Sequence, residues 1–225
     1  MTDNLFQLHL HTSESSACSQ CSGSLMARAC KYAGYSTIVI TDHFINANTT
    51  AHPRDPWPKQ VETLMRGFRN AKETGDRIGL CVLFGWETFN DGPEYLTYGL
   101  GETFLLDNPD IASLSSEEYL LRVEQAGGFV CHAHPYRVAP YIPPFTPAHT
   151  HLEAFEVFNA NNHPAQNPPA LLEARRHNLI ELAGADAHTP YHVRAGAMRS
   201  PWPIYDSPSL IEALRSRRCE IIESF

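Results

Sequence analysis

The chain has 225 residues, of which 43% are hydrophobic and 19% charged, a composition typical of a globular protein with a sizeable core and unlike that of disordered or fibrous chains. The formal net charge is −8 and Lys and Arg form no block, which argues against surface binding of long duplex nucleic acid. No apolar run approaches the ~20 residues of a membrane span, and the start of the chain lacks the basic region of an export signal. We therefore expect a cytoplasmic protein that has no membrane partner and keeps its six cysteines reduced.

Short apolar runs separated by turn residues predict seven strands, at 5–11, 37–43, 80–87, 95–100, 129–134, 154–159 and 179–186. Helical periodicity predicts helices between most of them, at 25–33, 59–74, 117–126 and 169–177. Ser115 and Glu118 have the spacing of a capping box at the start of the third helix. This alternation of strand and helix predicts a mostly parallel α/β sheet, closed or nearly closed, in a single domain over residues 1–225.

Two features modify this simple alternation. The interval between Glu87 and Tyr95 is too short for the crossover that a parallel neighbour requires, so we expect the fourth strand to be irregular. Two proline-rich stretches, 51–58 and 140–147, are typical of loops that project from strand ends. We expect both loops to form walls of the site.

Histidines and carboxylates close most of the predicted strands: His9, His11, Asp42, His43, Glu87, His132, His134, Asp186 and His188. Residues two apart in an extended chain share a face, and the carboxyl ends of parallel barrel strands meet at one place. Imidazole with carboxylate suits zinc, manganese or iron, and six or more ligands imply at least two ions. The alternative is a set of core or surface histidines with hydrogen-bond partners, but burying so many ionisable groups without a metal would be costly.

Five short motifs in this order resemble those of the polymerase and histidinol phosphatase (PHP) superfamily: His9-Leu10-His11-Thr12, Thr41-Asp42-His43, Gly85-Trp86-Glu87, Ala133-His134-Pro135 and Ala185-Asp186-Ala187-His188. The resemblance extends from Leu5 to about Thr189. It implies a single-domain distorted (β/α)7 TIM-like barrel, the PHP fold. It also implies two or three divalent metal ions (Zn, Mn or Fe) at the carboxyl ends of the strands.

The resemblance also implies a ligand set. It assigns the first ion to four residues, His9, His11, Glu87 and Asp186. Glu87 then bridges to a second ion at His134, and the third ion lies at His43 and His188.

This chain departs from the family pattern at two places. The family often has Asp-Gly where this chain has Ser16-Ala17, so we expect Glu14 to substitute as a ligand of the third ion. Many members place a histidine on the fourth strand, where this chain has Glu94 or its neighbour Tyr95. A carboxylate can ligate, so Glu94 is a candidate ligand of the second ion.

Several further residues are candidates for roles near the site. Arg137 and Arg194 follow the last two histidine motifs, and guanidinium groups suit phosphate; a solvated loop arginine is the alternative for each. His132 is expected to contact substrate or to support a ligand. Cys18 and Cys21 have the spacing of a zinc or redox pair, but no second pair accompanies them, so we interpret them as free thiols.

A hydroxide that bridges two metal ions is a nucleophile near neutral pH. We therefore expect a metal-dependent phosphoesterase or phosphatase that attacks a small phosphate ester, such as histidinol phosphate or a nucleotide, with Glu87, Asp186 and His188 in catalytic roles. The preference for phosphate rests mainly on the resemblance. The alternatives are a metal-dependent amide or lactone hydrolase and a non-catalytic metal-binding PHP module, and the sequence leaves the oligomeric state open.

Overall fold

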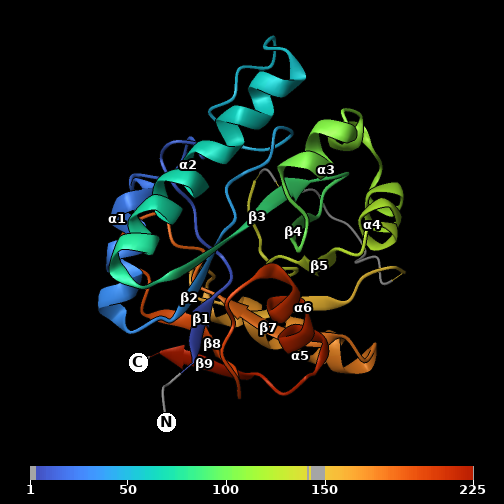
Figure 1. Cartoon of the computed structure of the whole chain (residues 1–225). Helices are drawn as coiled ribbons and strands as arrows, with labels where there is room; N and C mark the ends of the chain where they lie inside the picture. Colours follow the sequence, from blue (N-terminus) through green and yellow to red (C-terminus); the bar gives the residue numbers. More distant parts are fainter. Residues whose placement is uncertain (1–3, 141, 143–149, 225) are drawn as a thin grey trace.

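A computed structural model describes residues 4–140, 142 and 150–224 (Figure 1). Its strands form one sheet in the order β7-β6-β5-β4-β3-β2-β1-β8-β9. The strands are β1 (Leu5–Gln7), β2 (Thr37–Ile40), β3 (Cys81–Phe89), β4 (Glu94–Tyr98), β5 (Phe129–His132), β6 (Ala154–Asn159), β7 (Ile180–Gly184), β8 (Ala195–Arg199) and β9 (Glu220–Ser224). Strands β1 to β7 match the seven predicted strands, whereas β8 and β9 were not predicted.

The fourth strand runs against its neighbours. β4 pairs antiparallel with both β3 and β5, because the turn between β3 and β4 is too short for a crossover and closes a hairpin instead. The expected irregularity is thereby confirmed. The reversal has a consequence for the site: the first residue of β4, Glu94, lies at the same end of the sheet as the last residues of β3 and the end of β5.

The sheet curls until its first and seventh strands meet. Just beyond these strands, Leu10 and Ala187 form an isolated parallel bridge, in which the His11 backbone N–H donates to the Ala187 carbonyl at 3.0 Å. β8 then lies antiparallel beside β1 and carries β9 at the edge. The result is the expected mixed α/β fold with a nearly closed barrel.

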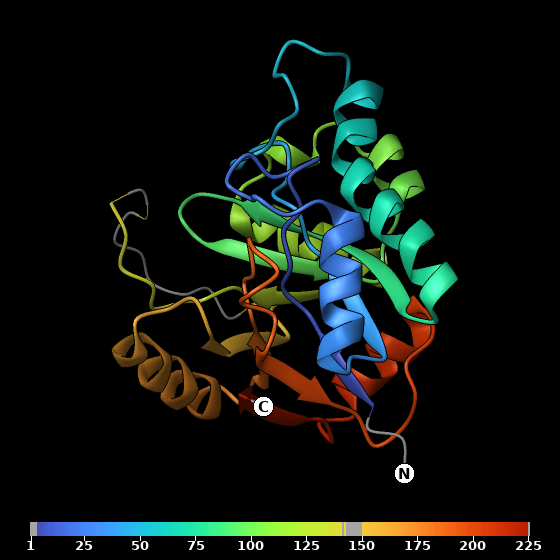
Figure 2. The same ribbon diagram turned by 90° about the vertical axis from the view of Figure 1, so that its left-hand side faces the viewer.

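Helices cover the outside of this barrel (Figures 1 and 2). They are α1 (Gly23–Ala33), α2 (Trp57–Ile78), α3 (Glu102–Asp107), α4 (Ser116–Gln125), α5 (Asn167–Arg176) and α6 (Ser207–Arg215). α1 and α2 lie side by side against β2 and β3. The predicted capping box of Ser115 and Glu118 is present at the start of α4. α2 continues past Gly75, the predicted end of the helix. Glycine is required at position 75 because a Cβ there would collide with Leu80 and Val82. The helix is instead capped by Gly79, whose φ of 66° suits glycine.

Apolar side chains fill both the barrel and the spaces under the helices. Phe6, Leu8 and Phe129 are among the barrel residues that are almost fully buried, and each side chain of this size stabilises the fold by about 1.5–3 kcal/mol. Within the described residues, no helix is long and apolar enough to cross a membrane. Most of the buried histidine, aspartate and glutamate side chains lie at the carboxyl end of the barrel.

Candidate metal centre

Eight of the nine residues predicted to bind metal gather at the carboxyl end of the barrel: His9, His11, His43, Glu87, Glu94, His134, Asp186 and His188. They form four overlapping groups of three, and in each group the ligand atoms lie within 4.8 Å of one another. Because the ligands follow β1, β2, β5 and β7 or lie on β3 and β4, the barrel itself brings them together.

The most deeply buried part of the centre is the inner group, His9, His11, Glu87 and Asp186. The Nε2 atom of His9 lies 3.3 Å from a Glu87 oxygen and 3.6 Å from an Asp186 oxygen. The Nε2 atom of His11 lies 3.5 and 3.3 Å from oxygens of the same two carboxylates. Two imidazoles and two carboxylates therefore point at one small volume.

Beside the inner group, the β3–β4 hairpin contributes two carboxylates. Glu87 Oε1 lies 3.0 Å from the Nε2 atom of His134, and Glu94 Oε2 lies 3.6 Å from the same nitrogen. Glu87 contacts His134 as well as His9 and His11 of the inner group, as a bridging ligand would. His134 and Asp186 both have positive φ, 32° and 49°, and such strain in non-glycine residues clusters at functional sites.

The outer group consists of His43, His188 and Cys18, and it borders the inner group at His11. The His11 ring stacks on the rings of His43 and His188 at centroid distances of 4.3 and 4.4 Å. Cys18 lines the same cavity as His43 and His188. Burial raises the pKa of this thiol, but the two histidine contacts outweigh burial and lower the pKa to about 6.

The donor atoms fit divalent cations. His9 Nε2, His11 Nε2 and His43 Nδ1 are buried and form no hydrogen bond within the described residues, although a carboxylate oxygen lies 3.3, 3.3 and 3.0 Å from them. A buried nitrogen without a hydrogen bond is costly unless something binds it. Burial, together with the neighbouring His43 ring, holds the pKa of His11 well below its usual value. His11 therefore favours the neutral imidazole form that a metal ligand requires. At His9 and His43 burial also lowers the pKa, but neighbouring acidic groups outweigh burial and raise the pKa.

The carboxylates of the inner group are ionised. Burial raises the pKa of Glu87, but the surrounding histidines, His9 foremost, outweigh it and lower the pKa well below its usual value. The pKa of Asp186 is also lowered, because His9, His11 and Arg137 outweigh burial. Two ionised carboxylates in a buried volume attract a cation strongly.

Glu156, on β6, supports the inner group and was not predicted. Its Oε1 lies 2.8 Å from His9 Nδ1, and its Oε2 accepts from the His134 backbone N–H at 2.9 Å and from Asn159 at 2.8 Å. A carboxylate that accepts from Nδ1 leaves Nε2 of the same ring as the metal ligand. Gly184 leaves room for it, since a Cβ there would collide with the Glu156 carboxylate. A lone Glu in an otherwise apolar strand was the available sequence signal.

Asp42 supports the segment that follows β1. It accepts hydrogen bonds from the Thr12 backbone N–H (2.5 Å), the Thr12 hydroxyl (2.6 Å) and the Ser16 hydroxyl (2.7 Å). Burial raises the pKa of Asp42 to about 6, although these hydrogen bonds oppose the shift. The aspartate of the second motif thus holds the turn between His11 and Cys18 rather than pointing at the inner group.

Glu14 does not join the centre, contrary to expectation. Its two carboxylate oxygens accept from the Gly23 backbone N–H at 3.1 and 3.0 Å, and one of them also accepts from the Asn70 side chain. This position at the N-terminus of α1 is favourable for a negative charge. Cys18, four residues later, occupies the place beside His43 and His188 that was predicted for Glu14.

Two of the three residues predicted to bind substrate also lie elsewhere. Arg194 is exposed, and its guanidinium lies 5.8 Å from the centre of the Tyr32 ring on α1. His132 is 1% exposed and packs against Tyr95 and Phe155 with ring centroids 5.2 Å from each. Neither residue lines the cavity beside the centre, so the structure does not bring them to the place where we expected them.

Arg137 does reach the cavity. Its guanidinium donates to Asp186 at 2.6 Å, to Asn159 at 3.0 Å and to Asn162 at 2.8 Å. Burial lowers the pKa of Arg137, but the Asp186 carboxylate outweighs this effect and raises it. A permanent positive charge therefore lies directly beside the inner group.

The cavity has a volume of about 640 Å³, a size suited to a small molecule. Its lining is polar apart from Ala47 and Phe89: Cys18, His43, Asn46, Asn48, Glu87, Glu94, His134, Arg137, Asn161, Asp186 and His188. The predicted wall at 51–58 is absent from the lining, because residues 46–48 supply that side; the predicted loop 140–147 lies mostly outside the described residues.

No family model and no curated protein matches the chain, but solved structures do. A two-domain protein from Bacteroides vulgatus ATCC 8482, containing a predicted PHP-like metal-dependent phosphoesterase, aligns with a TM-score of 0.76 at 18% identity over 99% of this chain; the chain spans only 65% of that protein. A candidate metal-dependent phosphoesterase from Bifidobacterium adolescentis ATCC 15703 aligns with a TM-score of 0.59 at 16% identity, covering 94% of this chain and 96% of its own.

An amidohydrolase from Chromobacterium violaceum with bound sulfate and no metal aligns with a TM-score of 0.54 at 14% identity, covering 97% of each chain. Structural likenesses at identities this low establish the fold alone. Together with the ordered motifs and the barrel they occupy, they show that this chain has the PHP-like TIM-barrel fold, as its resemblance to that superfamily implied.

Proposed function

We propose that this protein is a metal-dependent phosphoesterase of the PHP type that hydrolyses a small phosphate ester. The observation that carries the proposal is the position of Glu87. It contacts His9 and His11 on one side and His134 on the other, and Arg137 lies across the same cavity. This arrangement suits two neighbouring divalent ions with a cation beside them.

The proposed centre holds two or three divalent ions, zinc, manganese or iron, through the eight gathered residues. Such ions lower the pKa of bound water and neutralise phosphoryl oxygens. The residues of the chain position the substrate: the guanidinium fork of Arg137 is suited to a phosphate oxygen through Nη1, since Nε and Nη2 donate to Asn162, Asn159 and Asp186. Its contacts with Asn159 and Asn162 fix that fork in place.

Asp186 and His188 are the groups best placed to assist the nucleophile. Asp186 is 2% exposed and lies between His11 and Arg137. The side chain of His188 is 22% exposed and lines the cavity, so as a metal ligand it is placed to position the nucleophile there. The amide side chains of Asn48 and Asn161, which line the same cavity, suit a polar, uncharged leaving group.

Arg137→Ala tests the proposal with the metal retained. We expect kcat/KM for a generic phosphomonoester to fall about 10- to 100-fold, the size of a lost hydrogen bond to a charged group, with the metal content unchanged. Arg194→Ala is the matched control, because that arginine lies over Tyr32 outside the cavity, and it should leave kcat/KM unchanged.

A second candidate is a metal-dependent amide or lactone hydrolase, favoured by the likeness to the Chromobacterium violaceum amidohydrolase. The same metal-loaded protein should be assayed with phosphomonoesters, phosphodiesters, amides and lactones. Hydrolysis of carbonyl substrates alone would overturn the phosphoesterase proposal in favour of this candidate. Full metal without hydrolysis of any of them would favour a non-catalytic metal-binding module.

A further inference from the structure

Cys18 occupies a position in the metal centre that neither the strands nor the motifs supply. It lies in the segment that follows β1, and its thiol contacts His43, which follows β2, and His188, which follows β7. All three side chains line the cavity. Donor groups from three separate strand ends therefore face the same cavity.

The segment that carries Cys18 is fixed in place by its neighbours. The Ala17 backbone N–H donates to the Asn48 carbonyl at 2.9 Å, and the Gln20 backbone N–H donates to the His188 carbonyl at 3.0 Å. The Ser19 hydroxyl donates to the His11 carbonyl at 3.0 Å. In Figure 2 the segments after β1 and β2 run beside one another at the carboxyl end of the barrel. Hydrogen bonds on both sides of Cys18 thus hold its thiol at the two imidazoles.

The histidines of this group have nitrogens that suit a cation. His43 is 8% exposed, and its Nδ1 faces Glu87 Oε2 at 3.0 Å, so Nε2 is the nitrogen left for the outer group. His188 Nδ1 lies 3.0 Å from the Asp186 carbonyl oxygen; when that nitrogen carries the proton, Nε2 keeps the lone pair that a metal requires. Glu14, the carboxylate nearest in sequence, is engaged at Gly23.

We propose that Cys18 is a thiolate ligand of a metal ion held with His43 and His188, so that the outer group is a histidine–cysteine site. Sulfur is a soft ligand that favours zinc over manganese, whereas carboxylate-rich sets accept either. The outer group is therefore selective for zinc or another thiophilic ion, while the inner group, with two carboxylates, is less selective. This inference concerns the ion and does not depend on which ester, if any, the protein hydrolyses.

Cobalt(II) is the probe that tests it. When apoprotein is titrated with cobalt, a cobalt–thiolate bond produces a charge-transfer absorption in the near ultraviolet that nitrogen and oxygen ligands do not produce. We expect the wild-type protein to develop this absorption and Cys18→Ser to lose it. Cys18→Asp should still bind the outer ion through a carboxylate but without the absorption.

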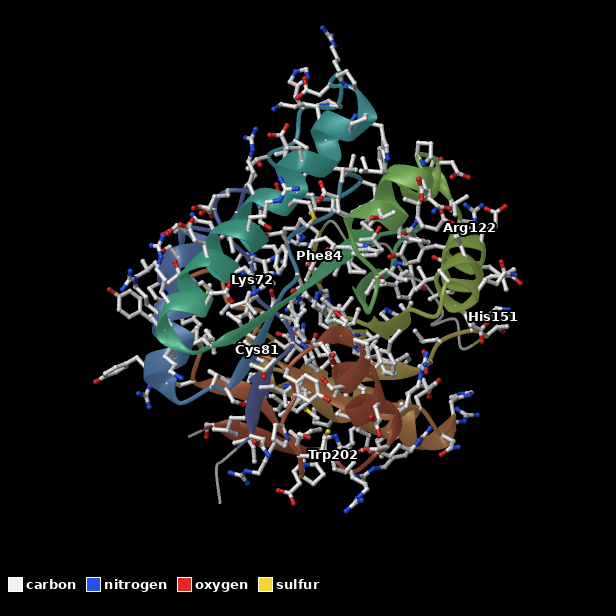
Figure 3. The ribbon with its side chains drawn as sticks, in the orientation of Figure 1. Lys72, Cys81, Phe84, Arg122, His151 and Trp202 are labelled. Carbon is white, nitrogen blue, oxygen red and sulfur yellow. The ribbon has the colours of Figure 1, made fainter. Side chains whose placement is uncertain are left out.

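Cys81→Ser is the matched control. Cys81, labelled in Figure 3, is also a free thiol, but it begins β3 and lies outside the cavity. Glu87 lies near the other end of the same strand. This variant should titrate as the wild type does. Loss of the absorption in Cys81→Ser, its retention in Cys18→Ser, or its absence from the wild-type protein would overturn the proposal.

Alkylation gives a second readout that requires neither cobalt nor substrate. Iodoacetamide should modify Cys18 in the apoprotein, since this thiol is exposed, and zinc should protect it because a coordinated sulfur is a poor nucleophile. Peptide mapping measures modification at Cys18 and Cys81 separately. Equal modification of Cys18 with and without zinc would contradict the proposal, even if phosphoesterase activity were found.

Discussion

The inner and outer groups of the metal centre are built differently. The inner histidines are fully buried, and Glu156 contacts Nδ1 of His9, the ring nitrogen that faces away from the inner group. The outer group is more accessible, since Cys18 is exposed and the His188 side chain is 22% exposed. It also depends on a loop rather than on strand ends alone. Rigid, supported ligands hold an ion more tightly than accessible ligands on loops, so the two groups should differ in affinity as well as in donor chemistry.

Glu87→Ala should have the largest effect, because this carboxylate contacts ligands of both groups, His9 and His43 among them. We expect activity to fall more than about 100-fold, beyond the 10- to 100-fold typical of losing an outer-shell partner. Elemental analysis should show fewer bound ions per chain. A variant with full metal and full activity would refute the bridging position assigned to Glu87.

Glu156→Gln tests the support behind the inner group alone. Gln cannot accept the His9 Nδ1–H as strongly as a carboxylate does, so we expect inner-ion affinity to fall about 10- to 100-fold, with little change at the outer group. Competition with a metallochromic chelator measures both affinities.

Glu153→Gln is the control for Glu156→Gln, because Glu153 precedes the same strand and pairs with Arg215 at the surface. A surface ion pair contributes at most about 1 kcal/mol, and metal affinity should not change. An equal loss of affinity in both variants would mean that strand β6 as a whole, rather than the Glu156 carboxylate, supports the centre.

Stepwise chelation compares the two groups within one protein. We expect the outer ion to leave first, at a chelator concentration lower by at least about 10-fold, which corresponds to ~1.4 kcal/mol. Ions per chain are counted after dialysis against increasing chelator. Loss of both ions in a single step would show that the groups act as one unit.

Ser115→Ala should have the smallest effect and separates fold stability from the metal centre. The Ser115 side chain caps α4 in a capping box with Glu118, and its loss should lower the free energy of unfolding by about 1 kcal/mol. Chemical denaturation measures this change. Metal content should remain that of the wild type, and a lost ion would indicate coupling between this helix end and the centre.

The strands and most ligands could be predicted because their signals are local. Apolar runs marked all seven barrel strands, and the too-short interval after Glu87 correctly predicted a break in the parallel order. β8 was missed because Ala195–Arg199 contains small residues and lacks the β-branched pattern of a strand. It becomes a strand through pairing with β1 and β9.

The sequence by itself determined which side chains stand at the ends of the barrel strands, because strand periodicity and residue type are both read along the chain. Only the tertiary structure decided which other side chains join them. Cys18 and Glu156 approach the histidines through contacts between segments far apart in sequence, whereas Glu14 turns to α1, Arg194 to Tyr32 and His132 to the core. The direction of a side chain outside regular structure depends on those distant partners, and no local pattern specifies it.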